Sequence, residues 1–524
     1  MKTGTTRLRK TPQFFFAALA IILSCTWPAL SYSSDTVVSA VRINDISRSQ
    51  ELVKSGADVN HPEPDGTTPL LWAVYNSSEE LVDLLLDAGA DPNMANALDI
   101  TPLLLASRYG NANMIKSLLA SGAMLKQPNL ASEPVLMSAA RAGSVDAVKA
   151  ILNAGADPDE TEPLDNQTAL MWATAEGHYD VTETLLEAGA NPNIQARINT
   201  LTERKNADFP TGGFTALHWA ARDGNEPLIN LLLENGADIN AKNGDKASPM
   251  MLAVINDHLD IAADLLNKGA DANDGTLYYA TIMHDATTDW RAMDGTLFRA
   301  DHPNKLSALD LTRILLEAGA DPNKPFIGQM HSESMCCDTK SKETPLYRAA
   351  KAADIDSIKM MLAHGGDPNW KPESEEKYVT IGVYEDIASK SALMVATTGG
   401  KGVGVAGGPN DLRNGPPPFR EEGNRDPAEA VRLLLEAGAD VSIIGPNNET
   451  ALHVAAKALD PAIVRSLVEH GADLNAENEK GETPLQVVEN MERPEPTPGF
   501  YFDAPPAWPE DIIALLNELA TNQN

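Results

Sequence analysis

The chain has 524 residues, too many for one ordinary hydrophobic core, so several domains or a repeat array are expected. Aromatic residues make up only 5% of the chain, which leaves burial to small apolar residues, mainly alanine and leucine, as in helical repeats. A net charge of −33 argues against a nucleic-acid partner, because phosphate contacts need concentrated lysine and arginine.

Residues 1–31 have the features of a secretory signal peptide. A basic start is followed by an apolar stretch from Phe14 to Leu23, and the small residues Ala29 and Ser31 come before the expected cleavage site. The apolar stretch is too short to span a bilayer comfortably, and no later segment is expected to be transmembrane. The sequence therefore predicts an exported protein, periplasmic or extracellular.

The cysteines leave one alternative for this N-terminus. The residues before Cys25 weakly resemble a lipoprotein cleavage box with an atypical leucine at Leu23, so a lipid anchor on Cys25 is the alternative to soluble processing. If cleavage follows Ser31 instead, only Cys336 and Cys337 remain. Two cysteines do not make a disulfide framework, so the fold must hold by packing alone.

A Gly-Ala-Asp-x-Asn sequence, or a close variant of it, recurs along the chain with a base period of 33 residues. Insertions lengthen the period at several places, which is typical of a repeat array. The glycines that open the copies are Gly56, Gly89, Gly122, Gly155, Gly189, Gly236, Gly269, Gly319, Gly365, Gly438 and Gly471.

Each period predicts two helices joined by a turn. Thr68-Pro69 opens a helix about twenty residues before Gly89, with threonine as the N-cap and proline at the first helical position. A second apolar helix follows, as at residues 228–233 in a later repeat, and glycine ends it because a left-handed backbone costs glycine little. The pattern predicts an all-α fold of about 11–12 helix-turn-helix repeats.

These repeats resemble those of the ankyrin family. The family pattern is most complete at residues 214–240 and 450–473. The resemblance implies an ankyrin-repeat solenoid with β-hairpin-like fingers and several loop insertions. The motif histidine is kept at His218 and His453, and where another residue replaces it, as at Leu71, a helix-opening hydrogen bond is lost but the burial is kept. The signal peptide and the long insertions are similar to those of exported, bacterial-type members.

The periodicity also predicts the organisation of the chain. The expected regions are a signal peptide at 1–31, an N-terminal capping repeat at 32–61, regular repeats at 62–275 with one finger insertion at 194–212, repeats with long insertions at 276–478, and a C-terminal capping repeat and tail at 479–524. Further insertions are expected in the fingers at 324–342 and 370–388, and between the two helices of a repeat at 285–305, 399–425 and 490–508.

No motif predicts an enzyme, a cofactor or a metal site. Residues 402–407 fit a dinucleotide fingerprint, but they follow a helix and run into a proline-rich loop, where the fingerprint does not work. Cys336 and Cys337 are adjacent and lack a second cysteine pair, so zinc is not expected; free thiols or a vicinal disulfide both stay open. The alternative function is an enzyme or small-ligand protein with a site in the inserted loops 285–305, 324–342 and 399–425.

The family resemblance also implies where a partner binds. In such proteins, partners contact the residue before the motif threonine and the last turn of the first helix, along a concave face. The candidate partner-binding residues are Tyr75, Arg108, Tyr109, Arg141, Phe214, Arg222, Asp223 and Lys351. Basic residues recur along this track, which favours an acidic or polar partner segment; alternatively, each arginine pairs with an acid of a neighbouring repeat.

Tryptophan recurs directly after the motif histidine position, at Trp72, Trp172 and Trp219. That position is expected to lie between stacked helices, so these rings are predicted to be core residues. The function predicted for the whole chain is an exported scaffold or adaptor that binds a protein partner through its concave face and inserted loops.

Overall fold

The protein is described by a computed structural model that places residues 36–126, 133–200, 210–285, 304–326, 343–372, 378–380, 383–385, 390–398, 424–491 and 507–523. The predicted signal peptide with Cys25, the Cys336–Cys337 pair and the glycine-rich residues 402–407 lie outside these ranges. Most of the inserted loops 285–305, 324–342 and 399–425 also lie outside them, so a site built from those loops stays a prediction.

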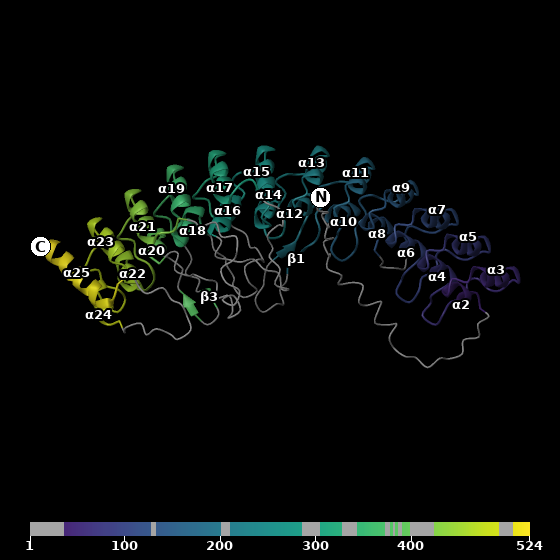
Figure 1. The fold of residues 1–524 in the computed structure, drawn as a ribbon, viewed down its shortest axis with the longest axis horizontal. Helices are drawn as coiled ribbons and strands as arrows, with labels where there is room; N and C mark the ends of the chain where they lie inside the picture. The colour runs from purple at the N-terminus through teal and green to yellow at the C-terminus, as the bar shows by residue number, and fades with distance from the viewer. Residues whose placement is uncertain are drawn as a thin grey trace, which may run out of the picture. The chain divides into compact units, whose positions relative to one another are not determined.

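The described residues form twelve successive helix pairs, as predicted for an all-α repeat solenoid (Figure 1). The first helices of the pairs are α2 (Val37–Arg42), α4 (Pro69–Tyr75), α6 (Pro102–Arg108), α8 (Val135–Arg141), α10 (Ala169–Ala175), α12 (Ala216–Arg222), α14 (Pro249–Ile255), α16 (Thr276–Asp285), α18 (Pro345–Ala352), α20 (Ala392–Ala396), α22 (Ala451–Ala458) and α24 (Pro484–Glu489). The second helices are α3 (Ile46–Lys54), α5 (Glu79–Asp87), α7 (Ala112–Ala120), α9 (Val145–Asn153), α11 (Tyr179–Glu187), α13 (Glu226–Glu234), α15 (Leu259–Asn267), α17 (Ala308–Glu317), α19 (Ile355–Ala363), α21 (Pro427–Glu436), α23 (Pro461–Glu469) and α25 (Pro509–Gln523).

Two short hairpins lie in the fingers. β1 (Ile198–Thr200) pairs antiparallel with β2 (Pro210–Gly212), and β3 (Tyr378–Thr380) pairs antiparallel with β4 (Val383–Glu385). A single 3₁₀ turn, η3 (Pro446–Asn448), precedes α22. None of the described helices is long and apolar enough to cross a membrane.

Two compact units make up the chain, one covering residues up to 106 with 111–130 and the other covering 107–110 with 131–524. In the first unit, α2 packs on α4, and α5 packs on both α3 and α7. In the second unit, the first helices pack on one another in sequence from α8 to α24 and form one layer, while the second helices form another (Figure 1). The core between the layers is made of residues such as Leu217 and Leu452, both fully buried.

The first helices begin where the sequence predicts. The Thr68 hydroxyl accepts the Leu71 N–H at 3.2 Å, which is the N-cap bond that threonine is favoured for. In repeats that keep the motif histidine, the ring extends this cap to the next repeat: His218 Nδ1 accepts the Thr215 N–H, and its Nε2 lies 3.2 Å from the Ala247 carbonyl oxygen. Burial lowers the pKa of His218 to about 4, so the ring is neutral at pH 7.

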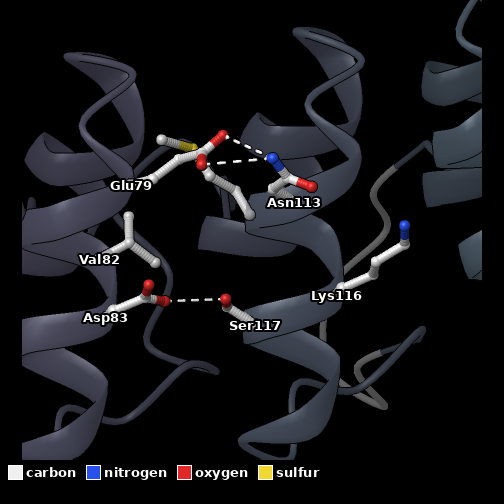
Figure 2. Close-up of a pocket in the computed structure, with 7 residues that line it drawn as sticks. Glu79, Val82, Asp83, Asn113, Lys116 and Ser117 are labelled. Atoms are coloured by element: carbon white, nitrogen blue, oxygen red, sulfur yellow. Dashed lines mark hydrogen bonds between the residues drawn. The ribbon is translucent and has the colours of Figure 1, made fainter.

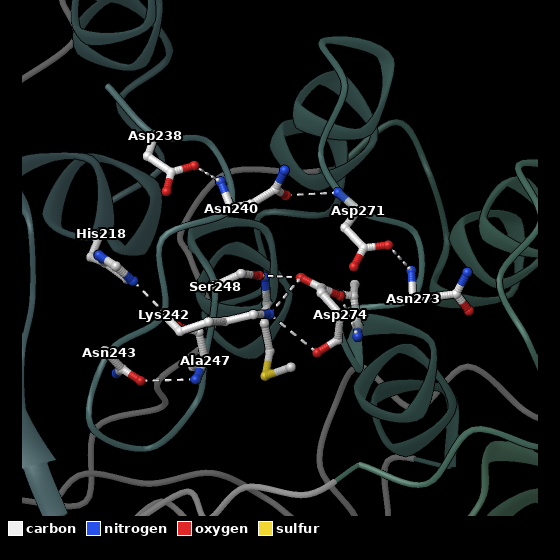
Figure 3. A network of polar contacts seen from close by, with 12 residues as sticks. His218, Asp238, Asn240, Lys242, Asn243, Ala247, Ser248, Asp271, Asn273 and Asp274 are labelled. Carbon is white, nitrogen blue, oxygen red and sulfur yellow. Dashed lines mark hydrogen bonds and ion pairs between the residues drawn. The ribbon is translucent and has the colours of Figure 1, made fainter. Parts of the chain in front are cut away.

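An asparagine ladder joins successive fingers. Figure 3 shows one step of it, from Asn240 to Asp271. Asn240 accepts the Asp271 N–H of the next repeat at 2.8 Å. Asn273 accepts the Asp321 N–H at 2.8 Å and donates to the Gly319 carbonyl at 3.1 Å, although 46 residues separate it from Gly319. The ladder therefore keeps neighbouring repeats in register across an insertion between the helices.

The third repeat lacks the residues of this ladder. Lys126, which carries no amide or carboxylate oxygen, stands where the ladder asparagine is expected, while the Met124 N–H still donates to Asn93 Oδ1 at 2.8 Å. Asn93 of the second repeat still donates to the Gly122 carbonyl, at 3.0 Å, within the first compact unit. The boundary between the two units falls directly after this repeat.

Candidate functional site

Four of the predicted partner-binding residues gather on the second compact unit, at the ends of α8, α10 and α12. We call this surface the Arg–Trp strip, and it consists of Arg141, Trp172, Glu176, Phe214, Trp219, Arg222 and Asp223. Trp172 and Trp219 each stand four residues after an N-cap threonine, Thr168 and Thr215, so they occupy equivalent positions on adjacent first helices. α10 packs against both α8 and α12, which brings the strip together.

The guanidinium of Arg141 reaches from α8 onto the next repeat. Its Cζ lies 4.5 Å from the centre of the Trp172 ring, within the range of a cation–π contact. Its Nε lies 3.5 Å from Glu176 Oε1, and the Arg141 side chain is 48% exposed. Among the described residues, no hydrogen-bond acceptor of good geometry meets any of its N–H groups. The ring and the carboxylate therefore hold the guanidinium in place and leave its hydrogen-bonding capacity unused among the described residues.

Arg222 makes a similar contact within its own repeat. Its Cζ lies 4.3 Å from the Trp219 ring centre, and its Nε and Nη2 donate to the two Asp223 oxygens at 2.8 and 3.0 Å. Phe214 lies against the same indole, with 5.1 Å between ring centroids. The Arg222 side chain is 36% exposed, and Nη1 makes no hydrogen bond among the described residues.

The prediction that the recurring tryptophans are core residues is wrong. Trp72, Trp172 and Trp219 are only half-buried, whereas the neighbouring Leu71, Met171 and His218 are buried. The helix turns the position after the motif residue out of the layer between helices, so the ring contacts an exposed side chain instead of filling the core. Each tryptophan ring thus packs against an exposed side chain: Tyr75, Arg141 or Arg222.

The alternative that each arginine pairs with an acid of a neighbouring repeat holds for Arg108 and Arg141, whereas Arg222 pairs with Asp223 of its own repeat. Arg108 lies 3.5 Å from Glu133, and Arg141 lies 3.5 Å from Glu176, an acid of the next repeat. Both arginines are nevertheless nearly half exposed, at 44% and 48%. Exposed ion pairs contribute little to stability, so they leave these cations available to a partner.

Two predicted tyrosines are exposed. In the first compact unit, Tyr75 is 43% exposed and meets Trp72 edge to face at 5.4 Å, while Trp72 Nε1 donates to Glu63 Oε2 at 2.9 Å. Tyr109, which directly follows α6, is 46% exposed. Exposed tyrosine and tryptophan are residue types enriched at binding hot spots.

Lys351 does not belong to an exposed surface. Its side chain is 15% exposed, and Nζ donates to Glu343 Oε1 at 3.0 Å, while Tyr278 of the preceding repeat donates to Glu343 Oε2 at 3.2 Å. Burial raises the pKa of Glu343, but the charges of Lys351 and Arg348 and these hydrogen bonds outweigh it, so the pKa lies below its usual value. Lys351 is therefore a structural counter-ion.

A second buried polar pair lies between repeats eight and nine. His284 Nδ1 is 2.5 Å from Asp354 Oδ2, and the two side chains are 4% and 1% exposed. Burial raises the pKa of Asp354, but the hydrogen bond and charge of His284 and the bonds from Ser357 bring it below the usual value. Asp354 also accepts the Ser357 N–H as the N-cap of α19. The pair thus ties α16 to α19.

A hollow between α5 and α7 on the first unit has a polar lining (Figure 2). Asn113 donates to Glu79 at 3.2 Å, and Ser117 donates to Asp83 at 2.8 Å, so these four polar side chains of the lining pair with one another. No group of three or more metal-ligating side chains occurs among the residues that the structure places. Neither feature indicates a ligand.

Comparisons with known proteins agree with the repeat pattern. A family model of ankyrin repeats in three copies matches residues 37–129, 103–196 and 198–286, and another model of ankyrin repeats in many copies matches residues 434–488. No curated protein sequence matches the chain.

Solved ankyrin repeat domains resemble parts of the chain. That of human ASB11 is 23% identical, with a TM-score of 0.39, and the match covers 45% of this chain and 98% of that one. That of Bcl-3, a member of the IkappaB protein family, is 26% identical, with a TM-score of 0.37, and the match covers 44% of this chain and 97% of that one.

Proposed function

Since the chain belongs to the ankyrin-repeat family, we propose that it is an exported scaffold or adaptor that binds a protein partner. Ankyrin repeats are generally protein–protein interaction modules, and their fold is typically a non-catalytic scaffold. A non-enzymatic role is part of the proposal. Family membership alone does not locate the binding surface, so that part of the proposal depends on the site geometry.

The Arg–Trp strip is the proposed contact surface. The observation that carries this proposal is that two arginines lie over half-buried indoles while 48% and 36% of their side chains stay exposed. Tryptophan and arginine are among the residue types enriched in binding hot spots, and stacking reduces the entropy that an arginine loses when a partner orders it. These features favour a surface prepared for a partner over one that only stabilises the fold.

Export is supported by the basic and apolar pattern of residues 1–31 and places the partner in the periplasm or outside the cell. The inserted loops extend the same proposal, because insertions in a repeat array fall on loops that often carry binding specificity.

Fractionation of producing cells tests the proposal that the chain is exported: we expect the chain in the exported fraction, shortened near residue 31. A full-length chain that stays in the cytoplasm would contradict it.

Site-specific photo-crosslinking tests the binding half. A crosslinking residue at Ala175, in the last turn of α10 beside the strip, is expected to capture one protein in producing cells. The matched position is Lys359 on α19, a second helix, where the lysine is 50% exposed. The adduct from position 175 should disappear when Arg141 and Arg222 are both changed to alanine. Equal adducts from both positions, or none from position 175, would contradict a partner on the strip.

A further inference from the structure

We propose that the partner segment is an extended acidic one, whose two carboxylates, about three residues apart, dock on Arg141 and Arg222. This inference rests on the proposed function, because it names the chemistry that the strip recognises. It follows from three properties of the strip. These are the hydrogen-bonding groups that have no partner, the contacts that hold the two guanidiniums in place, and the distance between the guanidiniums.

The unfilled hydrogen-bonding capacity of the strip is mostly on donors. A guanidinium carries five N–H groups. Arg222 uses two of them on Asp223, whereas Arg141 makes only a 3.5 Å ion-pair contact with Glu176. Both Asp223 oxygens are occupied, which leaves Glu176 as the one carboxylate of the strip without a hydrogen bond among the described residues. A partner that pairs with the two arginines must therefore bring acceptors.

The arginines are held in the geometry that a carboxylate needs. The guanidinium is a planar fork that matches a carboxylate bidentately, and such charge-assisted pairs are about twice as strong as neutral hydrogen bonds. Arg141 lies over Trp172 with its Nη groups uncommitted, so it can accept a carboxylate through two parallel bonds. Arg222 has its Nη1 edge left, because Asp223 takes Nε and Nη2. Arg141 is therefore the stronger of the two docking points.

The spacing of the two cations follows from the repeat. Arg141 reaches forward onto Trp172, while Arg222 stays over Trp219, so both guanidiniums lie above equivalent indoles of adjacent helices. Packed helices lie about 8–10 Å apart. A polyproline II segment returns to the same face every three residues, a rise of about 9 Å. Carboxylates at positions i and i+3 of an extended segment can thus reach both arginines.

The acidic character of the whole chain, with a net charge of −33, works against such a partner at long range. At about 0.15 M salt the Debye length is about 8 Å, so distant charges are largely screened while a direct arginine–carboxylate pair is not. The strip then selects its partner segment by direct arginine–carboxylate contacts and not by long-range attraction. Binding measurements belong at this salt concentration for that reason.

Three labelled proline-rich peptides of equal length test the inference by fluorescence anisotropy on the full exported chain. One carries two glutamates at i and i+3, one carries them at adjacent positions, and one carries two lysines at i and i+3. We expect the first peptide to bind at least about fivefold more tightly than the second, and the lysine peptide not to bind. Equal affinity for the first two peptides, or tighter binding of the lysine peptide, would overturn the proposal.

Variants connect this binding to the strip. Arg141→Lys keeps the charge but loses the planar fork, and it should weaken the i, i+3 peptide about tenfold. Arg313→Ala on α17 is the matched control, since Arg313 is also 48% exposed and ion-paired. The affinity of this variant for the i, i+3 peptide should stay within about twofold of that of the parent chain. An unchanged affinity of Arg141→Lys would exclude docking on the strip.

The crosslinked partner separates the two proposals. If a protein is captured at position 175 and its crosslinked segment lacks paired carboxylates, the acidic-segment inference fails and the scaffold function stands. If no protein is captured there, the scaffold function fails whatever the peptides do. A captured segment with carboxylates three residues apart supports both.

Discussion

The guanidinium of Arg141 lies over the indole ring of Trp172, one repeat further along the chain, with 4.5 Å between Cζ and the ring centre. Here the Arg141 side chain is 48% exposed and makes a single 3.5 Å contact with an acid. The contact positions the cation without burying it, which makes its contribution to stability separable from its contribution to binding.

Arg141→Ala should leave the stability of the chain nearly unchanged. An exposed cation–π contact contributes about 0.5–1 kcal/mol, and an exposed ion pair contributes about 0–1 kcal/mol. We therefore expect a loss of at most about 1–2 kcal/mol in urea unfolding followed by circular dichroism. A larger loss would mean that Arg141 is a structural residue and that binding defects of its variants have no simple meaning.

Lys351→Ala should cost far more than Lys457→Ala. Both lysines pair with a glutamate eight residues earlier, but Lys351 and Glu343 are 15% and 6% exposed, whereas Lys457 and Glu449 are 42% and 15% exposed. Removing one partner of a buried pair costs about 3–5 kcal/mol, and removing one of an exposed pair costs about 1 kcal/mol or less. Unfolding in urea measures both variants, and equal losses would contradict the structural role assigned to Lys351.

The buried histidine His218 should destabilise the chain in mild acid. Burial lowers its pKa to about 4, below the value of about 6.5 expected in the unfolded chain, so the unfolded state binds the proton more tightly. The stability that the neutral ring provides is fully present above pH 6.5 and is lost as the pH falls from 6.5 to about 4. The loss is about 3 kcal/mol at most.

His218→Leu is the matched variant, because leucine already occupies the equivalent position at Leu71 and Leu104. We expect it to be less stable at pH 7 and to show a smaller loss of stability between pH 6.5 and 4 than the parent chain. Melting temperatures of the parent chain and of His218→Leu, measured between pH 6.5 and 4, test this expectation. Parallel curves for the two proteins would show that His218 does not titrate in this window.

The third repeat should be a weak point in cooperative unfolding. Stability in a repeat array is a sum over repeats and their interfaces. Lys126 replaces the asparagine that joins one repeat to the next elsewhere, and Met124 replaces the aspartate that caps the turn before it. We expect differential scanning calorimetry to resolve two transitions, and the double variant Met124→Asp, Lys126→Asn to bring them closer together. A single transition in the parent chain would contradict this expectation.

The repeat pattern predicts the fold well because its signals are local. An N-cap threonine, an apolar helix and a glycine with a left-handed backbone each act within one repeat, so a helix pair could be predicted for each period. The contact between Arg141 and Trp172 joins neighbouring repeats instead, and an arginine and a tryptophan one period apart give no sign of which way either side chain points.

The sequence also could not predict which charged side chains are buried. Lys351 and Lys457 occupy the same position relative to a glutamate, yet the first is buried and the second is exposed. At Glu343 the pair also accepts a hydrogen bond from Tyr278 of the preceding repeat, a contact between repeats that the sequence does not reveal. His284 and Asp354 are likewise 70 residues apart and meet only because α16 and α19 belong to adjacent repeats.

The affinity of the crosslinked partner for the parent chain and for Arg141→Lys tests the central claim most directly. If the Arg–Trp strip is the binding surface, the substitution should weaken the complex about tenfold, measured by calorimetry at about 0.15 M salt, without lowering the melting temperature. Equal affinities for the two proteins, with both fully folded, would place the partner elsewhere on the chain and contradict the account.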